Sequence, residues 1–274
     1  MHKVALINGK LTSVDDVTIP AVSAAAMYGH GVFTTIAVYD REPFLIEKHW
    51  RRLNDNAGKL GIDVDVSFEQ VESWLRQLLD ANLVTDCRAR VTLLDSGGAG
   101  LWTGQTQKRT DVLIVTGERL ERPKTFRLTT SPYTINPRSP LVGVKSCNYL
   151  EHLISYEDAK RRGFDEAIRL NERGEVTSAA MANLFWLKDA QLYTPAVESG
   201  CLAGTTRELI FENLECKEIC AGIAGLLAAD AAFICSAGIG IRQVSMVNDR
   251  QFDLVDHEIL HLLPPNTKTR MSAR

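Results

Sequence analysis

The sequence predicts an α+β protein of two domains. Its 274 residues suffice for two modest domains, and 45% hydrophobic with 24% charged residues is typical of globular proteins. The expected strands and helices are mixed without the strict βαβ alternation of a doubly wound sheet. A charged segment with a proline follows one β-rich part and precedes another. We therefore expect an N-terminal α/β domain over 1–117, a linker over 118–124 and a second α/β domain over 125–274.

The first domain is expected to begin with a hairpin, because Asn8-Gly9 is a strong turn signal between two short β-type runs. The run 32–39 is rich in β-branched residues and predicts a strand, and PFLIE after the turn DRE predicts its return partner. Apolar residues at helical spacing then predict two helices. The remaining expected elements are helices over 47–60 (Trp50, Leu53, Ala57 and Leu60 on one face) and 68–81 (Val71, Leu75 and Leu78 inward), and strands over 89–94 and 111–117.

The second domain is expected to open with a strand over 126–131 and a proline-rich loop. The apolar run Ala221–Ile241 contains Asp230 and many small residues, so a short helix and a buried strand explain it better than a membrane span. Further helices are expected over 150–162, ending at Gly163, and near 206–214 and 221–229.

Charge and cysteine content limit the partners and the compartment. A net charge of −3 gives no basic excess for nucleic acid or an anionic membrane, and the basic tail 268–274 is short. The N-terminus lacks a long apolar stretch, so a secretory signal is not expected. The closest of the six cysteines, Cys216 and Cys220, match neither a zinc nor a redox spacing. We expect free, mostly buried thiols in a reducing cytoplasm.

The segment His257-Glu258-Ile259-Leu260-His261 matches the H-E-x-x-H pattern of zinc proteases. Such a site needs a third ligand, and no His, Asp, Glu or Cys occurs among the last 13 residues. The prolines at 264 and 265 also stop a helix. We therefore expect no metal, and an amphipathic C-terminal helix with exposed His and Glu.

The loop Gly97-Gly98-Ala99-Gly100 lacks the G-x-G-x-x-G spacing of a dinucleotide site. It follows a strand, but no clear helix or acidic ribose partner comes after it. A flexible loop that covers a pocket is the better interpretation.

Lys145 lies in the apolar segment LVGVKSCNYL. A buried ammonium is costly, and a desolvated lysine is a good nucleophile toward an aldehyde. On this segment alone, a lysine at a strand end that reaches water is the favoured interpretation. Three other segments change that balance. The run 174–178 leads into 182–186 as a turn plus strand, 202–207 opens a helix whose free N–H groups would hold a phosphate, and HWRRL at 49–53 places arginines on a helix. A lysine, an anion site and an arginine are what pyridoxal phosphate requires.

Taken together, these segments resemble the class IV pyridoxal-phosphate enzymes, which include branched-chain and D-amino-acid aminotransferases and aminodeoxychorismate lyase. The resemblance runs from Ile7-Asn8-Gly9 to about Val244. It implies the PLP fold type IV, D-amino-acid aminotransferase-like, with a barrel-like second domain. It also implies pyridoxal 5′-phosphate as the cofactor, a small-molecule substrate and a homodimer.

The resemblance also implies roles for individual residues. Lys145 corresponds to the lysine that forms the Schiff base with the cofactor and moves protons. Tyr149 would contact the cofactor's phenolic oxygen, and Tyr28–Phe33 matches the Y-G-D-G-V-F segment that shapes the substrate pocket. The implied phosphate site comprises Arg52, the backbone N–H groups of Thr205 and Thr206, and Ser236 with the adjoining Ala237.

One implied cofactor contact departs from the family. Ser178 stands where the family has a glutamate, five residues before the Asn of N-L-F. The glutamate keeps the pyridine nitrogen protonated, whereas a serine hydroxyl can only form a hydrogen bond. The loss of a charge-assisted hydrogen bond typically costs about 1.5–3 kcal/mol, roughly ten- to a hundredfold in rate. Glu175 is a poor substitute, because it lies three residues away on an alternating strand.

Other departures concern the substrate. Phe33-Thr34-Thr35 replaces the F-E of aminotransferases and resembles aminodeoxychorismate lyase, so Phe33 and Thr35 are candidate substrate contacts. The family's arginine before the glycine loop is replaced by Leu94-Asp95. Arg138 is a candidate replacement for binding a carboxylate, and a solvated loop arginine is at least as good an interpretation. Asn148-Tyr149-Leu150 is closer to the aminotransferases.

The favoured hypothesis is an aminodeoxychorismate lyase-like enzyme that releases pyruvate and p-aminobenzoate through the Lys145 aldimine. The alternative is an aminotransferase that moves an amino group between a small amino acid (branched-chain or D-amino acid) and a 2-oxo acid. A second alternative, based on Ser178, is a catalytically impaired homologue that keeps the cofactor.

Overall fold

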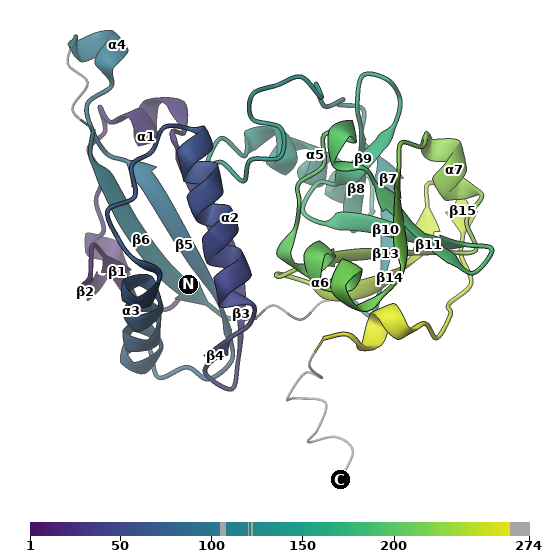
Figure 1. Cartoon of the computed structure of the whole chain (residues 1–274), viewed down its shortest axis with the longest axis horizontal. Coiled ribbons are helices and arrows are strands. Elements are labelled where there is room, and N and C mark those ends of the chain that lie inside the picture. Colours follow the sequence, from purple (N-terminus) through teal and green to yellow (C-terminus); the bar gives the residue numbers. More distant parts are fainter. Residues whose placement is uncertain (105–107, 120, 122, 264–274) are drawn as a thin grey trace. The chain divides into compact units, whose positions relative to one another are not determined.

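The chain forms two compact units in the computed structural model, which describes residues 1–104, 108–119, 121 and 123–263 (Figure 1). The first unit comprises Met1–Leu120 together with Val144–Tyr149, and the second comprises Glu121–Gly143 and Leu150–Arg274. The segment Val144–Tyr149, expected within the second domain, thus groups with the first unit. The expected linker 118–124 falls partly outside the described residues, so the domain boundaries stay a prediction.

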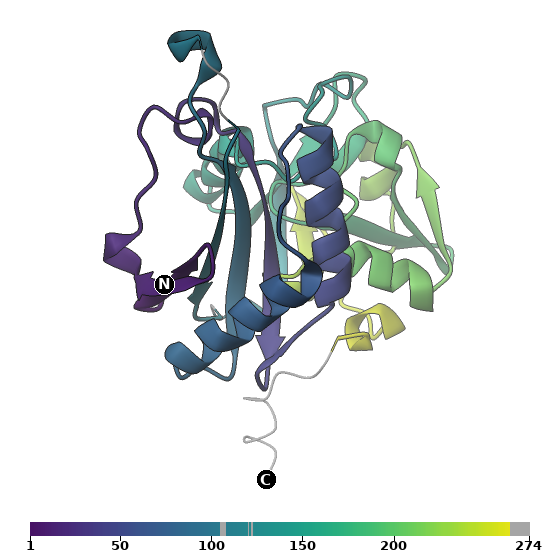
Figure 2. The same ribbon diagram turned by 60° about the vertical axis from the view of Figure 1, so that its left-hand side comes forward.

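The first unit is a six-stranded antiparallel sheet in the order β2-β1-β6-β5-β3-β4, with the two long helices α2 and α3 on one face (Figure 2). Its core combines Val32 and Val91 of the sheet with Leu53 of α2 and Leu75 of α3. The elements are β1 (Val4–Ile7), β2 (Lys10–Ser13), a 3-10 turn (Val14–Asp16), α1 (Ala24–Tyr28), β3 (Gly31–Tyr39), β4 (Glu42–Pro43), α2 (Ile46–Lys59), α3 (Phe68–Ala81), β5 (Cys87–Asp95), α4 (Gly100–Thr103) and β6 (Thr110–Gly117).

Most of these elements confirm the sequence prediction. The exception is the return strand expected for PFLIE, which is much shorter in the structure. Helix α3 begins at a capping box between Ser67 and Gln70 and buries the predicted apolar face. The predicted strand PFLIE reduces to β4, because Leu45 adopts a left-handed conformation (φ +56°) and caps α2, which begins at Ile46. A turn at that residue ends any strand and redirects the chain into the helix.

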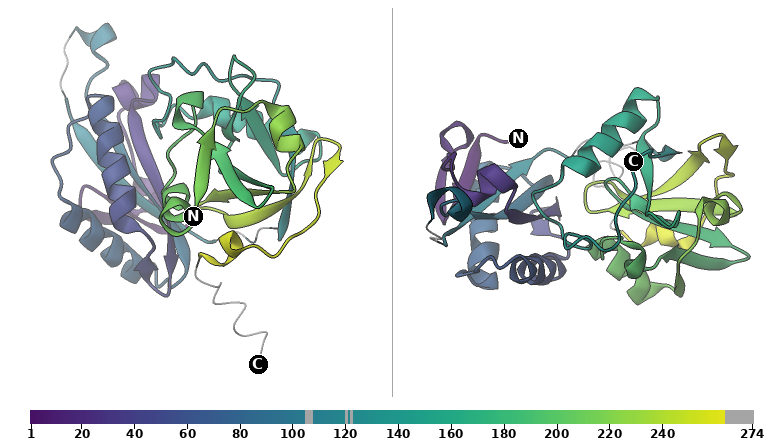
Figure 3. Two further views of the ribbon diagram at one scale, coloured as in Figure 1. Left: turned by 45° about the vertical axis from the view of Figure 1, so that its right-hand side comes forward. Right: turned by 90° about the horizontal axis from the view of Figure 1, so that it is seen from above.

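The second unit is a nine-stranded mixed sheet in the order β12-β11-β10-β13-β14-β7-β8-β9, with β15 beside β14. Strand β9 passes into β10 through a tight turn, in which Ala179 N donates to Ala182 O, so the sheet curls (Figure 3). The elements are β7 (Thr125–Thr130), α5 (Leu150–Arg161), β8 (Glu166–Leu170), β9 (Val176–Ala179), β10 (Asn183–Lys188), β11 (Gln191–Pro195), a 3-10 turn (Val197–Ser199), α6 (Thr205–Asn213), β12 (Cys216–Ile219), α7 (Ile223–Leu227), β13 (Ala231–Ser236), β14 (Gly240–Val247), β15 (Arg250–Gln251) and a 3-10 turn (Glu258–His261).

The C-terminal segment differs from the expected amphipathic α-helix. It forms only the four-residue 3-10 turn Glu258–His261, in which the His257 ring accepts the N–H of Ile259 and Ile259 is buried. The two prolines expected to stop the helix, and the basic tail 268–274, lie outside the described residues. The run Ala221–Ile241 forms α7 and the buried strand β13, as predicted.

All six cysteines are free thiols, of which Cys87, Cys201 and Cys235 are buried and Cys220 is exposed. In the described part of the chain, no helix has the length and apolar character needed to cross a membrane.

Candidate active site

The segment that carries Lys145 is fixed to the start of strand β3. Phe33 N donates a hydrogen bond to Lys145 O (3.0 Å), and Cys147 N donates to Gly31 O (2.8 Å). Position 31 requires a glycine, since a Cβ there would lie 2.8 Å from the Leu93 carbonyl oxygen. The sheet therefore holds the backbone of Lys145 through main-chain bonds that do not depend on its side chain.

The Lys145 amine lies among aromatic rings. Its Nζ is 3.4 Å from the Tyr149 hydroxyl, to which it donates, and 4.5 Å from the centre of the Phe33 ring. The Phe33 and Tyr149 rings meet edge to face at 5.2 Å. The Arg90 guanidinium stacks on the Phe33 ring at 3.5 Å from its centre. Three predicted site residues are thus brought together, and Arg90 joins them from β5 although the sequence did not single it out.

The pKa of Lys145 falls from its ordinary 10.5 to about 7. Burial is the largest cause, followed by the positive charges of Arg52 and Arg90. At neutral pH about half of such amines are unprotonated, against roughly one in several thousand for an ordinary lysine. An unprotonated amine is the form that attacks a carbonyl carbon and accepts a proton.

Arg52 is oriented from the helix side of the same strand. Its Nη2 donates to Thr34 Oγ1 (3.0 Å), and Thr34 Oγ1 lies 2.6 Å from His49 Nδ1. Burial, and then the charges of Arg52 and Lys145, lower the pKa of His49 to about 3, so the ring is neutral. We assign the Thr34 hydroxyl proton to His49 Nδ1, because the same oxygen accepts from Arg52. Thr34, fixed by His49, thus helps to hold the Arg52 guanidinium through its Nη2.

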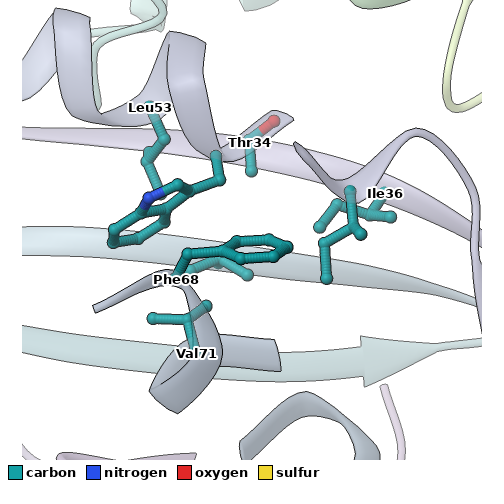
Figure 4. Close-up of a pocket in the computed structure, with 8 residues that line it drawn as sticks. Thr34, Ile36, Leu53, Phe68 and Val71 are labelled. Carbon is teal, nitrogen blue, oxygen red and sulfur yellow. The ribbon is translucent and has the colours of Figure 1, made fainter. Parts of the chain in front are cut away.

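A small apolar cavity lies on the same side of β3, under α2 (Figure 4). In Figure 4 the Thr34 hydroxyl points away from Phe68 and Val71, which line the cavity with Ile36 and Leu53. Apolar walls suit side-chain packing and not a charged ligand. The lining residues are Thr34, Ile36, Ile46, Trp50, Leu53, Phe68, Val71 and Val91.

The second unit builds a separate set of anion-binding groups at the start of α6. Gly204 caps this helix without a side-chain hydrogen bond, and a Cβ at Gly204 would collide with Asn183 Oδ1. Asn183 Nδ2 also donates to Leu202 O (2.7 Å), which fixes the approach to the helix. The first N–H groups of the helix belong to Thr205 and Thr206, both buried residues, and such groups favour an anion.

Ser236 and Ala237 lie at the same end of the second unit. Cys235 pairs with Asn183 across β13 and β10, so the end of β13 adjoins the residue that holds the α6 loop. Thr205, Thr206, Ser236 and Ala237 thus belong to the second unit, and Arg52, the other member of the predicted phosphate site, belongs to the first. Their ligand role stays a prediction.

Ser178 is a buried residue of β9, 7% exposed. The nearby Glu175 cannot replace a missing carboxylate at Ser178, because its side chain is held by Arg173 (2.7 Å) and Asn171 (2.7 Å). Thr35 pairs with Arg90 across β3 and β5, on the Phe33 face of the sheet. Arg138 is exposed in its loop, where its backbone N–H bonds Asn136 Oδ1.

His30 and Asp95 are paired at the base of the glycine loop. His30 Nδ1 lies 2.9 Å from Asp95 Oδ2, and His30 Nε2 donates to Leu60 O at 2.9 Å. Asp95 Oδ1 also accepts the N–H of Gly97, so this pair holds the base of the glycine loop.

The H-E-x-x-H segment places its two histidines in separate contacts. His257 caps the 3-10 turn, and His261 Nε2 bonds Asp256 at 2.7 Å. Over residues 1–104, 108–119, 121 and 123–263, no three His, Cys, Asp or Glu side chains are grouped to hold a metal ion.

Comparison with known proteins agrees with this fold. The family model for amino-transferase class IV matches residues 31–247. The chain is 29% identical over 244 residues to the aminodeoxychorismate lyase of Bacillus subtilis, covering 86% of this chain and 83% of the lyase. It is 28% identical over 266 residues to the branched-chain-amino-acid aminotransferase of Escherichia coli K12, covering 89% and 84%. A crystal structure of the Escherichia coli branched-chain aminotransferase superposes with a TM-score of 0.87 at 25% identity, over 96% of this chain and 92% of that one.

The chain therefore belongs to the class IV aminotransferase family and is an enzyme. The predicted fold is confirmed, and the cofactor of this family is pyridoxal phosphate. The residues present fit such a group: an amine with a pKa near 7, two arginines beside it, and a glycine-lined helix start suited to an anion.

Proposed function

We propose that the protein is a pyridoxal-phosphate lyase of the aminodeoxychorismate lyase type, which releases pyruvate and p-aminobenzoate. The observation that carries this choice is the run Phe33-Thr34-Thr35, which resembles aminodeoxychorismate lyase and whose first residue bonds the Lys145 backbone. The neutral, buried Ser178 is compatible with it. Aromatisation of the product ring supplies driving force in this reaction. A cofactor ring that withdraws electrons less strongly should therefore slow this reaction less than it slows amino-group transfer.

Lys145 would hold the cofactor and move protons at its Nζ. Pyridoxal phosphate, when bound, supplies an aldehyde carbon that reacts with amines and a ring that withdraws electrons. The depressed pKa of Lys145 lets its amine act as nucleophile at neutral pH and then carry a proton from one substrate atom to another. Tyr149 orients Nζ through the 3.4 Å hydrogen bond, and Phe33 limits its access to water.

Arg52, Thr205, Thr206, Ser236 and Ala237 would bind the phosphate group. The hydrogen bond from Arg52 Nη2 to Thr34 Oγ1, itself fixed by His49, would direct the guanidinium, which carries a permanent positive charge. Ser178 would donate a hydrogen bond to the ring nitrogen. Phe33 and Thr35 would contact the substrate; Arg138, exposed in its loop, is the weakest of these assignments.

The test compares two reactions on one cofactor-loaded preparation. Incubation with aminodeoxychorismate should release p-aminobenzoate, read by fluorescence, and pyruvate in equal amounts. Branched-chain or D-amino acids with 2-oxoglutarate should give glutamate at a rate at least tenfold lower. Lys145→Ala should abolish both reactions. A faster amino-group transfer would replace the lyase proposal by an aminotransferase, which the Escherichia coli relative and Tyr149 favour.

Absence of both reactions in a protein that binds the cofactor would identify an impaired homologue. We further propose a homodimer, as the family resemblance implies, located in a reducing cytoplasm, which the free thiols favour. Light scattering coupled to size-exclusion chromatography would test the dimer, and a mass of one chain at micromolar concentration would contradict it.

A further inference from the structure

Arg169 is a buried cation that the proposed chemistry does not use. It lies on β8 with only 1% of its surface exposed, among the largest fully buried side chains of the described residues. Helix α5 packs on β8 (Figure 1). Arg169 Nη2 bonds Glu151 Oε2 of that helix at 3.3 Å. A permanent charge at such depth is costly, so its position requires a reason beyond packing.

A β-bulge places Arg169 directly opposite Ser178. Leu170 pairs with Val176, but Arg169 pairs with Ser178, so Thr177 is the extra residue. The Thr177 hydroxyl donates to the Arg169 carbonyl at 3.1 Å and fixes this register. Residues paired in this way share one face of the sheet, with Cβ atoms about 4.5–5.5 Å apart. The Arg169 side chain therefore leaves the sheet beside the Ser178 hydroxyl.

Two acidic side chains, Glu166 on the same strand and Glu151 on α5, belong to the elements around Arg169. Glu166 is held by the N–H groups of Ala167 (2.8 Å) and Met181 (3.2 Å). The side chain of Glu151 is 80% exposed, so water screens its charge far more than that of the buried guanidinium. His152, the titratable residue next to Glu151 on α5, bonds the carbonyl of Ala180.

We propose that Arg169 sets the charge state of the cofactor's ring nitrogen: its positive charge keeps that nitrogen unprotonated, as the acceptor of a hydrogen bond from Ser178. This inference rests on the proposed function, in which Ser178 faces the ring nitrogen. Arg169 acts through space and touches no reacting atom, so it is a positioning residue. A unit charge about 6–10 Å away, at an effective dielectric constant of about 20, shifts a pKa by roughly one to two units.

The consequence is a choice of reaction and not a uniform loss of rate. Family members with a glutamate stabilise negative charge on the substrate through a protonated ring. With arginine and serine at these positions, the unprotonated ring stabilises negative charge on the substrate less. Only substrates whose leaving group or product makes the reaction favourable should then react fast. The pair thus restricts the site to eliminations of the kind proposed above.

The test reads the ring nitrogen directly. Protein loaded with pyridoxal phosphate labelled with ¹⁵N in the ring is titrated from pH 6 to 8 by ¹⁵N NMR, which separates protonated from unprotonated pyridine. Wild-type protein should show the unprotonated shift throughout. Arg169→Gln should raise the apparent pKa of the ring nitrogen by about one to two units, Arg169→Lys should restore the wild-type behaviour, and the exposed control Arg161→Gln should change nothing.

A protonated nitrogen in wild-type protein, or no shift in a loaded Arg169→Gln variant, would overturn the inference and leave the proposed function intact. Failure of wild-type protein to bind the cofactor would instead overturn the proposed function. If Arg169→Gln does not fold, Ser178→Ala provides the second test: its ring nitrogen should stay unprotonated, because the charge and not the hydroxyl sets its state.

Discussion

Replacing Arg90 should restore a more ordinary pKa to Lys145. Arg90 Cζ lies 3.5 Å from the centre of the Phe33 ring and Lys145 Nζ lies 4.5 Å from the same centre, so the two charges are at most about 8 Å apart. At that distance and an effective dielectric constant of about 20, their repulsion is about 2 kcal/mol, or roughly 1.5 pKa units. Arg90→Met keeps most of the stem on the ring and removes the charge.

The expected pKa of Lys145 in Arg90→Met is therefore about one to two units above 7. The unprotonated fraction at pH 7 falls from about a half to between a tenth and a hundredth, so the amine reacts roughly five- to fiftyfold more slowly. The assay follows the rate at which the cofactor-free protein forms a coloured adduct with pyridoxal between pH 6 and 10. Pyridoxal lacks the phosphate, so changes at the phosphate site do not enter.

Two variants control this experiment. Arg90→Lys keeps the charge and should leave the profile near that of the wild type. Arg88→Met removes another guanidinium from the same strand. This guanidinium bonds the carbonyl of Glu118 and is not among the causes of the lowered Lys145 pKa. If Arg90→Met shows the wild-type pKa within 0.3 units, the charge of Arg90 is not a cause of the shift and the reasoning is refuted.

Three further predictions follow from the structure. Gly204→Ala should weaken cofactor binding at least tenfold in an absorbance titration, because the new Cβ meets Asn183 Oδ1. The control Gly58→Ala, in an open position on α2, should stabilise the fold by up to about 1 kcal/mol. Equal cofactor affinities of the two variants would contradict the role of Gly204. The pKa of His49 is about 3 in the folded state and 6.5 in the unfolded state, so the unfolded state binds more protons between these pH values. From pH 7 to 4, the free energy of unfolding measured in urea should fall by about 3 kcal/mol more in the wild type than in His49→Gln. Parallel plots of this free energy against pH would argue against a neutral buried ring. Ser178→Glu should raise the rate of amino-group transfer about tenfold in stopped-flow experiments, and further in an Arg169→Gln background; an unchanged rate in loaded protein would count against our account of this position.

Helix α3 and the first hairpin could be predicted because their signals are local. Ser67 with Gln70 caps the helix, and the Asn8-Gly9 turn fixes the hairpin, without help from distant residues. On α2 the buried stripe His49, Leu53, Asn56 and Ala57 has the spacing i, i+4, i+7 and i+8, so the burial of His49 was open to prediction. The apolar face we expected was drawn from hydrophobic residues alone and missed both polar members.

The contacts of Arg90 and Arg169 could not be predicted from the same information. Which face of β5 carries the site depends on where Val144–Tyr149 joins the sheet, a pairing more than 50 residues distant in sequence. Strict alternation on β8 and β9 would have paired Arg169 with Thr177, and only the bulge moves it to Ser178. A register shift of one residue leaves no periodic signal.

The pair of His30 and Asp95 has a consequence for the engineering of this protein. Its hydrogen bonds connect the start of β3 with the carbonyl of Leu60 and the N–H of Gly97. A replacement at only one of the two positions breaks the bond that fixes the base of the glycine loop. Grafting a foreign glycine loop onto this chain should therefore succeed only if the residue at position 30 is exchanged with it.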